Sequence, residues 1–188
     1  MSADPAGLDD RGWTAHQAGQ FEEAERLYLE AVSILEQGEG AARIDLVNVL
    51  GHLSALYDDF EQYEDALSAA ETAQMVVDEF ETIFEGEEGA LIRMQCLTAA
   101  SNALRGLERT ADAEPVLREA LAIAGTAFGS AHPEYAVAAH NLSVVLRELR
   151  RPGESRRLGK AALRILEREF AAADPRVAAV RDNLRMLG

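Results

Sequence analysis

Four histidines and one cysteine are the residues best suited to bind a metal or attack a substrate. His16, His52, His132 and His140 are dispersed along the chain, and none stands in an HExxH motif or a paired metal-ligand spacing. Cys96 has no CxxC neighbour and lies in the apolar run LIRMQCLTAA, where a thiol behaves as a small hydrophobe. The sequence therefore predicts no metal site, no cofactor and no catalytic cysteine.

Segments that cradle phosphates or present a nucleophilic serine are also missing from the sequence. There is no GxGxxG, GxxxxGKS or GxxxxGKT segment, and there is no GxSxG segment. Neighbouring acids such as Asp58 and Asp59 are common on solvated helices, so we do not assign them as general acid and base. We predict that the chain is not an enzyme.

Charge is distributed very unevenly along the chain. Its 188 residues include 33 acidic and 18 basic side chains, for a formal net charge of −15. Residues 1–94 hold 22 acidic and 4 basic side chains, whereas residues 95–188 hold 11 acidic and 14 basic ones. An excess of acid repels a phosphate backbone, so nucleic acid is not expected as a partner. The complementary halves favour self-association into a homo-oligomer.

Length and hydropathy limit the class of protein. A chain of this length suits a single domain, and its 48% hydrophobic residues suit a folded one. The N-terminal segment MSADPAGLDDRGW carries no basic and apolar secretory signal, and no stretch is apolar enough to span a membrane. We expect a soluble, cytoplasmic protein with no membrane partner.

A repeat organises the whole chain. Small residues at 24, 66, 113 and 155 follow polar turns at intervals of 42, 47 and 42 residues, and a second set stands twelve residues before each. The eight positions are Gly12, Ala24, Ser54, Ala66, Ser101, Ala113, Ser143 and Ser155. Because antiparallel helices approach closely only where their side chains are small, each repeat is predicted to be a helical hairpin.

The apolar spacing predicts helices and no strands. The expected helices are residues 8–18, 21–37, 42–58, 61–84, 88–106, 110–127, 133–149, 153–170 and 175–187. Pro133 and Pro175 suit first-turn positions, and the second repeat interval carries five extra residues around FEGEEG. The predicted fold is an all-α solenoid.

The pattern of small and aromatic residues resembles the tetratricopeptide repeat (TPR) family. Phe21 and Tyr63 stand near the start of second helices, and the pairs His132-Pro133 and Asn141-Leu142 are similar to a signature of the 42-residue repeats found in kinesin light chains and many bacterial proteins. The resemblance implies a right-handed superhelix of hairpins at residues 8–37, 42–84, 88–127 and 132–170, with a capping helix at 174–187. Residues 1–188 would form one domain.

The second half departs from the family pattern. Thr110 and Pro152 stand where the aromatic residue is expected, and Ser155 and Gly159 replace an alanine and a bulky residue. We expect looser packing in this half.

The resemblance also implies a concave groove lined by the first helix of each hairpin, with asparagines that bind the backbone of an extended peptide. The candidate peptide-binding residues are Asn48, His52, Asn102, Arg105, His140, Asn141, Arg147 and Asn183. An amide side chain offers a donor and an acceptor together, which matches a peptide unit. A solvated helix face is the alternative for each asparagine, and Trp13 is expected to pack in, or line the groove of, the first hairpin.

Basic residues bias the C-terminal half towards acidic partner segments. Arg105 and Arg147 would bind carboxylates through charge-assisted contacts. The run from Arg147 to Arg168 could dock an acidic protein surface, but an exposed, salt-bridged helix face is the preferred interpretation. The leading hypothesis is a cytoplasmic, bacterial scaffold that binds a protein or peptide segment in its groove. The alternative is a regulatory sensor whose superhelix changes shape when a signalling peptide or small ligand binds.

Overall fold

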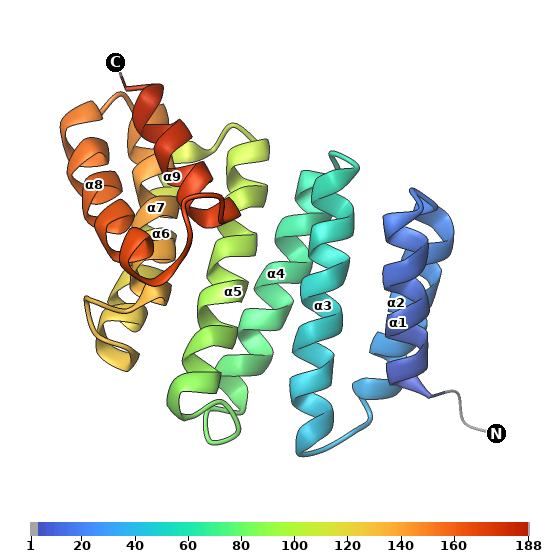
Figure 1. The fold of residues 1–188 in the computed structure, drawn as a ribbon. Coiled ribbons are helices and arrows are strands. Elements are labelled where there is room, and N and C mark those ends of the chain that lie inside the picture. The colour runs from blue at the N-terminus through green and yellow to red at the C-terminus, as the bar shows by residue number, and fades with distance from the viewer. Residues whose placement is uncertain (1–3, 188) are drawn as a thin grey trace. The chain divides into compact units, whose positions relative to one another are not determined.

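The fold consists of helices joined by short turns. The computed structural model describes residues 4–187; Met1, Ser2, Ala3 and Gly188, which the predicted domain includes, lie outside the described residues. The helices are α1 (Pro5–Gln17), α2 (Phe21–Leu35), α3 (Ala41–Asp59), α4 (Tyr63–Glu79), α5 (Gly86–Gly106), α6 (Thr110–Ala127), α7 (Pro133–Glu148), α8 (Pro152–Glu169) and α9 (Pro175–Arg185) (Figure 1). No strand occurs within residues 4–187, so the all-α prediction is confirmed.

The described residues fall into two compact units, divided between Leu107 and Glu108. Unit 1 contains α1 to α5 and unit 2 contains α6 to α9. The predicted third hairpin is therefore shared, because α5 belongs to unit 1 and α6 to unit 2. That the whole chain folds as a single domain stays a prediction.

Small side chains lie at the helix crossings inside each unit, as the repeat predicts. All eight positions are buried. A Cβ atom added to Gly12 of α1 would lie 2.6 Å from the ring of Tyr28 on α2. In the next hairpin, the Ser54 hydroxyl donates a 2.8 Å hydrogen bond to the carbonyl oxygen of Ala66. The predicted reason for the repeat is confirmed at both crossings.

The turns inside the hairpins share one backbone conformation. Gly19, Glu61, Glu108 and Arg150 occupy the same place in successive repeats, and all have left-handed φ angles of 71°, 60°, 59° and 57°. The residue after three of them donates a backbone hydrogen bond into the last turn of the preceding helix, as Gln62 does to Tyr57. The same backbone turn therefore recurs in all four repeats, although glycine occupies the left-handed position only in the first.

Two predicted helix boundaries differ from the structure by more than two residues. Helix α1 begins at Pro5 rather than residue 8, because the Asp4 carboxylate accepts a hydrogen bond from the Ala6 N–H and caps the helix. Helix α4 ends at Glu79 rather than residue 84, since the following residues form a tight turn that buries Phe84. A Cβ at Gly89 would lie 1.9 Å from the Phe84 carbonyl oxygen, so this turn requires glycine there.

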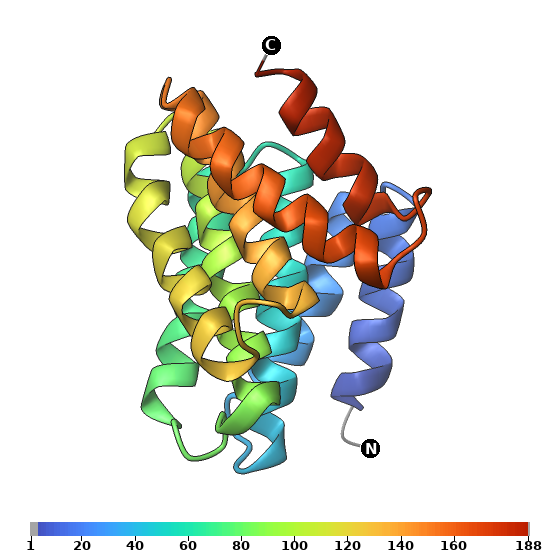
Figure 2. The ribbon, with the colours of Figure 1, turned by 60° about the vertical axis from the view of Figure 1, so that its left-hand side comes forward.

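In unit 2, helix α9 packs against α8 and also touches α7 (Figure 2). Ser143 of α7 links the three helices: its carbonyl accepts from the Ser155 hydroxyl at 2.6 Å, and its hydroxyl accepts from the Asn183 amide at 2.8 Å. A Cβ at Gly159 would lie 2.9 Å from Leu184. The expectation of looser packing is therefore wrong, because the small residues let α9 approach closely.

Each unit has its own apolar core. Leu27, Tyr28 and Leu53 are among the buried residues of unit 1, whereas Leu166, Val177 and Val180 are among those of unit 2. None of the helices in residues 4–187 combines the length and the apolar character that crossing a membrane requires.

Candidate functional site

Three helices of unit 1 form one face. Helix α3 contacts both α1 and α5, while α2 and α4 pack between successive members of this set. Their exposed residues include Trp13 of α1, Asn48 of α3, and Gln95 and Asn102 of α5. We call this surface the α1–α3–α5 face.

A cavity of about 290 Å³ opens between α3, α4 and α5. Its walls are apolar and largely buried, and its polar residues are two exposed amides and one imidazole. The apolar lining comes from Val47, Ala70, Ala73, Ile92, Cys96 and Ala99, and the polar lining from Asn48, His52 and Gln95. Since an apolar cavity of about 150 Å³ can hold benzene, this one has room for a large aliphatic side chain.

Gly51 lines this cavity and contributes no side chain to it. It lies inside α3, where glycine costs about 1 kcal/mol relative to alanine. A Cβ added here would meet nothing within 4 Å, so neither packing nor backbone conformation requires glycine. The sequence thus retains an unfavourable helix residue at a place where any side chain would narrow the cavity.

Two reciprocal histidine–aspartate pairs join α1 to α3. His52 Nδ1 lies 2.8 Å from Asp9 Oδ1, and His16 Nε2 lies 2.9 Å from Asp59 Oδ2. Each pair is separated by 43 residues, one more than the repeat period. The two pairs lie seven residues apart on both helices, so they connect α1 and α3, which run parallel, at two levels. We call these two pairs the histidine–aspartate rungs.

Trp13 lies between these rungs. Its ring centroid is 5.6 Å from that of His16 and 5.4 Å from that of His52, and the residue remains 45% exposed. His52 both contacts Trp13 and lines the cavity. The cavity and the exposed indole are therefore adjacent parts of one site.

The thiol of Cys96 in the cavity wall has low reactivity. Burial raises the pKa of Cys96 to about 11, and the negative charge of Asp78 acts in the same direction. A thiol with such a pKa stays protonated at neutral pH and is a poor nucleophile. Cys96 therefore contributes apolar surface to the cavity wall.

The other two predicted residues of unit 1 lie on α5. Asn102 is exposed on the same side of the helix as Gln95, seven residues earlier. Arg105 is half-buried, and its positive charge opposes the burial and the Asp59 charge that together raise the pKa of Asp58. The structure thus brings Asn48, His52 and Asn102 onto one face, with Arg105 at its end.

The predicted residues of unit 2 have different surroundings. His140 and Asn141 are half-buried on α7, and burial, with the Arg147 charge, lowers the pKa of His140. The Arg147 guanidinium lies 2.8 Å from the Met186 sulfur and 3.8 Å from the Glu148 carboxylate. Asn183 is only 4% exposed and its amide nitrogen donates to Ser143, so this side chain packs α9 onto α7.

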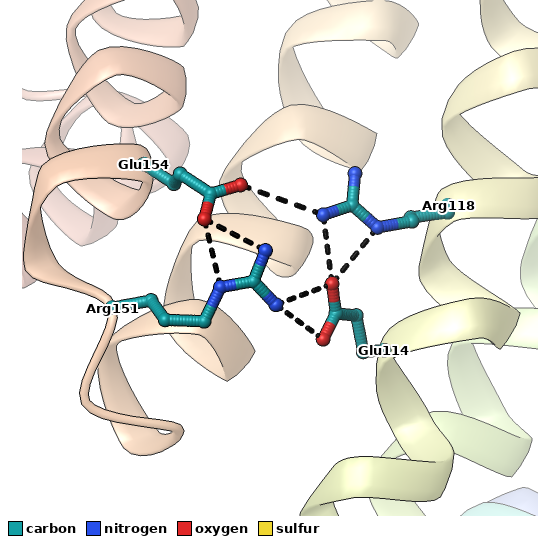
Figure 3. A network of polar contacts seen from close by, with 4 residues as sticks. All are labelled: Glu114, Arg118, Arg151 and Glu154. Carbon is teal, nitrogen blue, oxygen red and sulfur yellow. Dashed lines mark hydrogen bonds and ion pairs between the residues drawn. The ribbon is translucent and has the colours of Figure 1, made fainter.

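Most arginines of unit 2 are held by carboxylates. Glu114, Arg118, Arg151 and Glu154 form a closed ring between α6 and the start of α8 (Figure 3). Burial opposes ionisation of Glu114, but hydrogen bonds from Arg118 and Arg151 outweigh it and lower its pKa. These contacts give Arg118 and Arg151 a structural role in unit 2.

Three cations on the outer side of α8 differ from those arginines. Within the part of the chain that the structure describes, Arg157, Lys160 and Arg164 are exposed and make no hydrogen bond or ion pair. Their spacing of three and four residues places them in one row, which we call the α8 ridge. Like charges at these spacings destabilise a helix slightly, so the row is not explained by the fold of α8.

No metal centre was found. Among residues 4–187 there is no group of three or more histidine, cysteine, aspartate or glutamate side chains placed to hold a metal ion.

Family comparisons agree with the helical repeat. Two models, both described as tetratricopeptide repeat, match residues 8–43 and 94–168, which together make up more than half of the chain. The chain belongs to the tetratricopeptide repeat family. The family predicted from the small and aromatic residues is therefore confirmed.

Solved TPR-like structures share the fold at low sequence identity. The apo form of RapI is 17% identical, with a TM-score of 0.80 over 98% of this chain and 63% of the RapI chain. A putative kinesin light chain from Podosopora anserina with nearly identical TPR-like repeats is 16% identical, with a TM-score of 0.75 over 98% of this chain and 86% of the other. A Rap protein complexed with competence and sporulation factor is 20% identical, with a TM-score of 0.73 over 96% of this chain and 47% of the other. A search of curated proteins gave no match.

Sequence reasoning missed the most connected part of the site. Asp9 and His16 are not among the residues predicted to line the groove, and the sequence does not decide whether Trp13 packs in the first hairpin or lines its groove. A signal was available, because Asp9–His52 and His16–Asp59 have the same separation of 43 residues with the two residue types exchanged.

Proposed function

We propose that this TPR protein is an interaction scaffold whose unit 1 binds an extended segment of a partner protein. An aliphatic side chain of the segment enters the cavity between α3, α4 and α5. The exposed amides of Asn48 and Gln95 at the cavity bind the peptide backbone, and Asn102 extends the same row on α5. No catalytic role is assigned to the site.

The observation that carries this proposal is the combination of an apolar cavity with a glycine that nothing in the fold requires. Gly51 lowers helix stability and leaves the cavity open. Binding sites for apolar groups are typically pre-formed hollows with a few polar groups at their edges, and this cavity has that composition.

A peptide selection tests the proposal. Random peptides displayed on phage are selected on the full chain, and the enriched pool is then tested on Gly51→Leu, which places an isobutyl group in the cavity mouth. Ala55→Leu is the matched control, because Ala55 is exposed on the same helix but does not line the cavity. We expect the pool to bind the parent and Ala55→Leu, but not Gly51→Leu. Equal binding by all three proteins would exclude the cavity as the site.

A regulatory sensor is the second candidate function. Its support is the fold shared with the Rap protein that was solved in complex with competence and sporulation factor. A sensor would change its radius of gyration in solution when an enriched peptide binds, whereas a rigid scaffold would not. Small-angle scattering with and without that peptide separates the two functions.

Acidic segments are proposed as partners of unit 2, at the α8 ridge. The support is the row of Arg157, Lys160 and Arg164, whose charges no residue of the described chain neutralises. The acidic N-terminal half of a second copy offers such a partner, which would make the protein a homo-oligomer. Sedimentation at low and high salt tests this: association should weaken as salt rises and should be lost in Arg157→Glu/Arg164→Glu. A monomer under all conditions would exclude the second copy.

A further inference from the structure

The indole of Trp13 and the carboxylates beside it form a feature that backbone binding does not use. The chain has one tryptophan, and it is among the most exposed large hydrophobic residues of unit 1. Packing does not explain its position, since 45% of the residue remains accessible while its ring contacts two histidines.

The indole is held in a fixed orientation by the two histidine–aspartate rungs. Asp9 orients His52 and Asp59 orients His16, and each imidazole then contacts Trp13. A ligand that docks on this indole therefore meets a side chain whose mobility is already restricted. Preorganisation of this kind reduces the entropy lost on binding.

The charge around the indole is negative. Asp9 precedes Trp13 by one helical turn and retains 22% side-chain exposure, and Asp59 retains 68%. Both carboxylates hydrogen-bond to imidazoles. The arginine nearest in sequence, Arg11, is directed instead towards Glu23 of α2 at 4.0 Å. This acidic setting is local to a half of the chain that carries 22 acidic and 4 basic side chains.

An exposed indole flanked by carboxylates is suited to bind an organic cation. The ring attracts the charge through its quadrupole, and the carboxylates add Coulomb attraction. We infer that this cluster binds a lysine or arginine side chain of the same partner segment that places an aliphatic side chain in the cavity. His52 is shared by the cluster and the cavity, so the basic and aliphatic side chains would lie close together in the segment. The inference rests on the proposed function and adds the chemistry of the partner.

The peptide selection described above supplies the test, because the two subsites can be removed separately. On the parent protein we expect peptides enriched in an aliphatic residue with lysine or arginine nearby. On Trp13→Leu and on Asp59→Asn, which keeps a hydrogen-bond acceptor for His16, the basic enrichment should disappear while the aliphatic enrichment remains. Glu71→Gln, on the exposed side of α4, removes one charge far from the cluster and should leave both enrichments unchanged.

The outcomes separate the inference from the proposed function. Loss of the aliphatic enrichment in Gly51→Leu supports the cavity whether or not basic residues are selected. A parent pool without basic residues, or a basic enrichment that survives in Trp13→Leu, would overturn the cation site. An equal loss in Glu71→Gln would also overturn it, because general attraction by the acidic half would then explain the selection.

A direct titration completes the test. One enriched peptide and its analogue with norleucine in place of the basic residue are titrated into the parent protein while the fluorescence of Trp13, the sole tryptophan, is recorded. We expect the analogue to bind about 3- to 30-fold more weakly and to lose the change in indole emission. Equal affinities with unchanged emission would overturn the inference.

Discussion

At the scale of single residues, the same amino acid serves opposite purposes at positions 12 and 51. Gly12 is buried against the ring of Tyr28, where a Cβ would lie 2.6 Å from a ring carbon. Gly51 faces open space at the cavity. The first glycine is required by packing, whereas the second is required by nothing in the fold.

Alanine substitutions should separate these two roles. Gly12→Ala is expected to destabilise the protein by about 1–3 kcal/mol, because the fully buried Tyr28 ring has to shift. Gly51→Ala is expected to stabilise it by about 0.5–1 kcal/mol through helix propensity. Urea unfolding of both variants measures the differences; a destabilised Gly51→Ala would show that the glycine has a packing role.

Cys96 should be unreactive in the native protein. Burial raises its pKa to about 11, so the thiolate fraction at about pH 8 is very small. A chromogenic disulfide reagent should modify the thiol only as fast as the protein opens, and at once in denaturant. Fast reaction of the native protein would contradict the buried thiol in the cavity wall.

His140 should make the stability of unit 2 depend on pH. Burial lowers its pKa in the folded state below its ordinary value of 6.5, so the folded protein binds a proton less readily than the unfolded chain. The stability that the protein gains from a neutral, buried His140 is therefore fully present above about pH 6.5, and it is lost as the pH falls below that value. The midpoint of urea unfolding should fall over this range in the parent and fall less in His140→Gln.

At the scale of helices, local sequence determines where an element begins more clearly than where it ends. Asp4, His132 and Asp174 each precede a proline and accept a hydrogen bond from the N–H two residues later. The starts at Pro133 and Pro175 were predicted from the prolines and the repeat period, whereas the start at Pro5 was missed although Asp4 and Pro5 form the same kind of pair. The end of α4 could not be predicted, since Phe84 continues the apolar spacing but packs from a turn.

The cap of α9 provides a test at this scale. The Asp174 carboxylate accepts hydrogen bonds from the Arg176 side chain and backbone, which lower its pKa to about 2 although partial desolvation opposes them. We expect Asp174→Ala to speed amide exchange in the first turn of α9, whereas Asp174→Asn, which can still cap, should change it less. The parent should lose this protection only as the pH falls from about 3.8 towards 2. Unchanged exchange in Asp174→Ala would contradict the cap.

At the scale of the whole molecule, the packing is mostly between neighbours in sequence. Within each unit, helices contact the next helix or the next but one, as α1 contacts α2 and α3, and as α7 contacts α8 and α9. In such an arrangement the free energy of unfolding is close to the sum of the stabilities of single repeats and of the interfaces between neighbouring repeats. Damage at one end should therefore remain local.

Hydrogen exchange on Gly12→Ala tests this expectation. We expect faster exchange in α1 and α2, and in α3 through the histidine–aspartate rungs, with α7 and α8 unchanged. Mass spectrometry of peptic fragments resolves these helices. A uniform increase over the whole chain would show instead that the protein unfolds as one cooperative body.

The sequence predicts the architecture well but the candidate site only in part. Small residues at a fixed period required closely packed hairpins, and all eight of them are buried. Asn48 and His52 follow from the same helical periodicity. The cavity and the rungs depend on which side chains of different helices meet, and periodicity does not encode that. Asn183 matched a family motif, yet Ser143 and the close approach of α9 give its amide nitrogen a partner inside the fold.

The left-handed turns have a practical consequence for engineering. Glu61, Glu108 and Arg150 hold φ angles near 60° that side-chain-bearing residues adopt at a cost of roughly 1–2 kcal/mol, while the first repeat uses Gly19 for the same bend. Replacing these three residues with glycine or asparagine should raise the melting temperature of the protein. For glycine, the gain is smaller because glycine also adds conformational freedom to the unfolded backbone. None of the three lines the cavity or contacts the indole ring, so a more stable variant can keep the proposed binding residues unchanged.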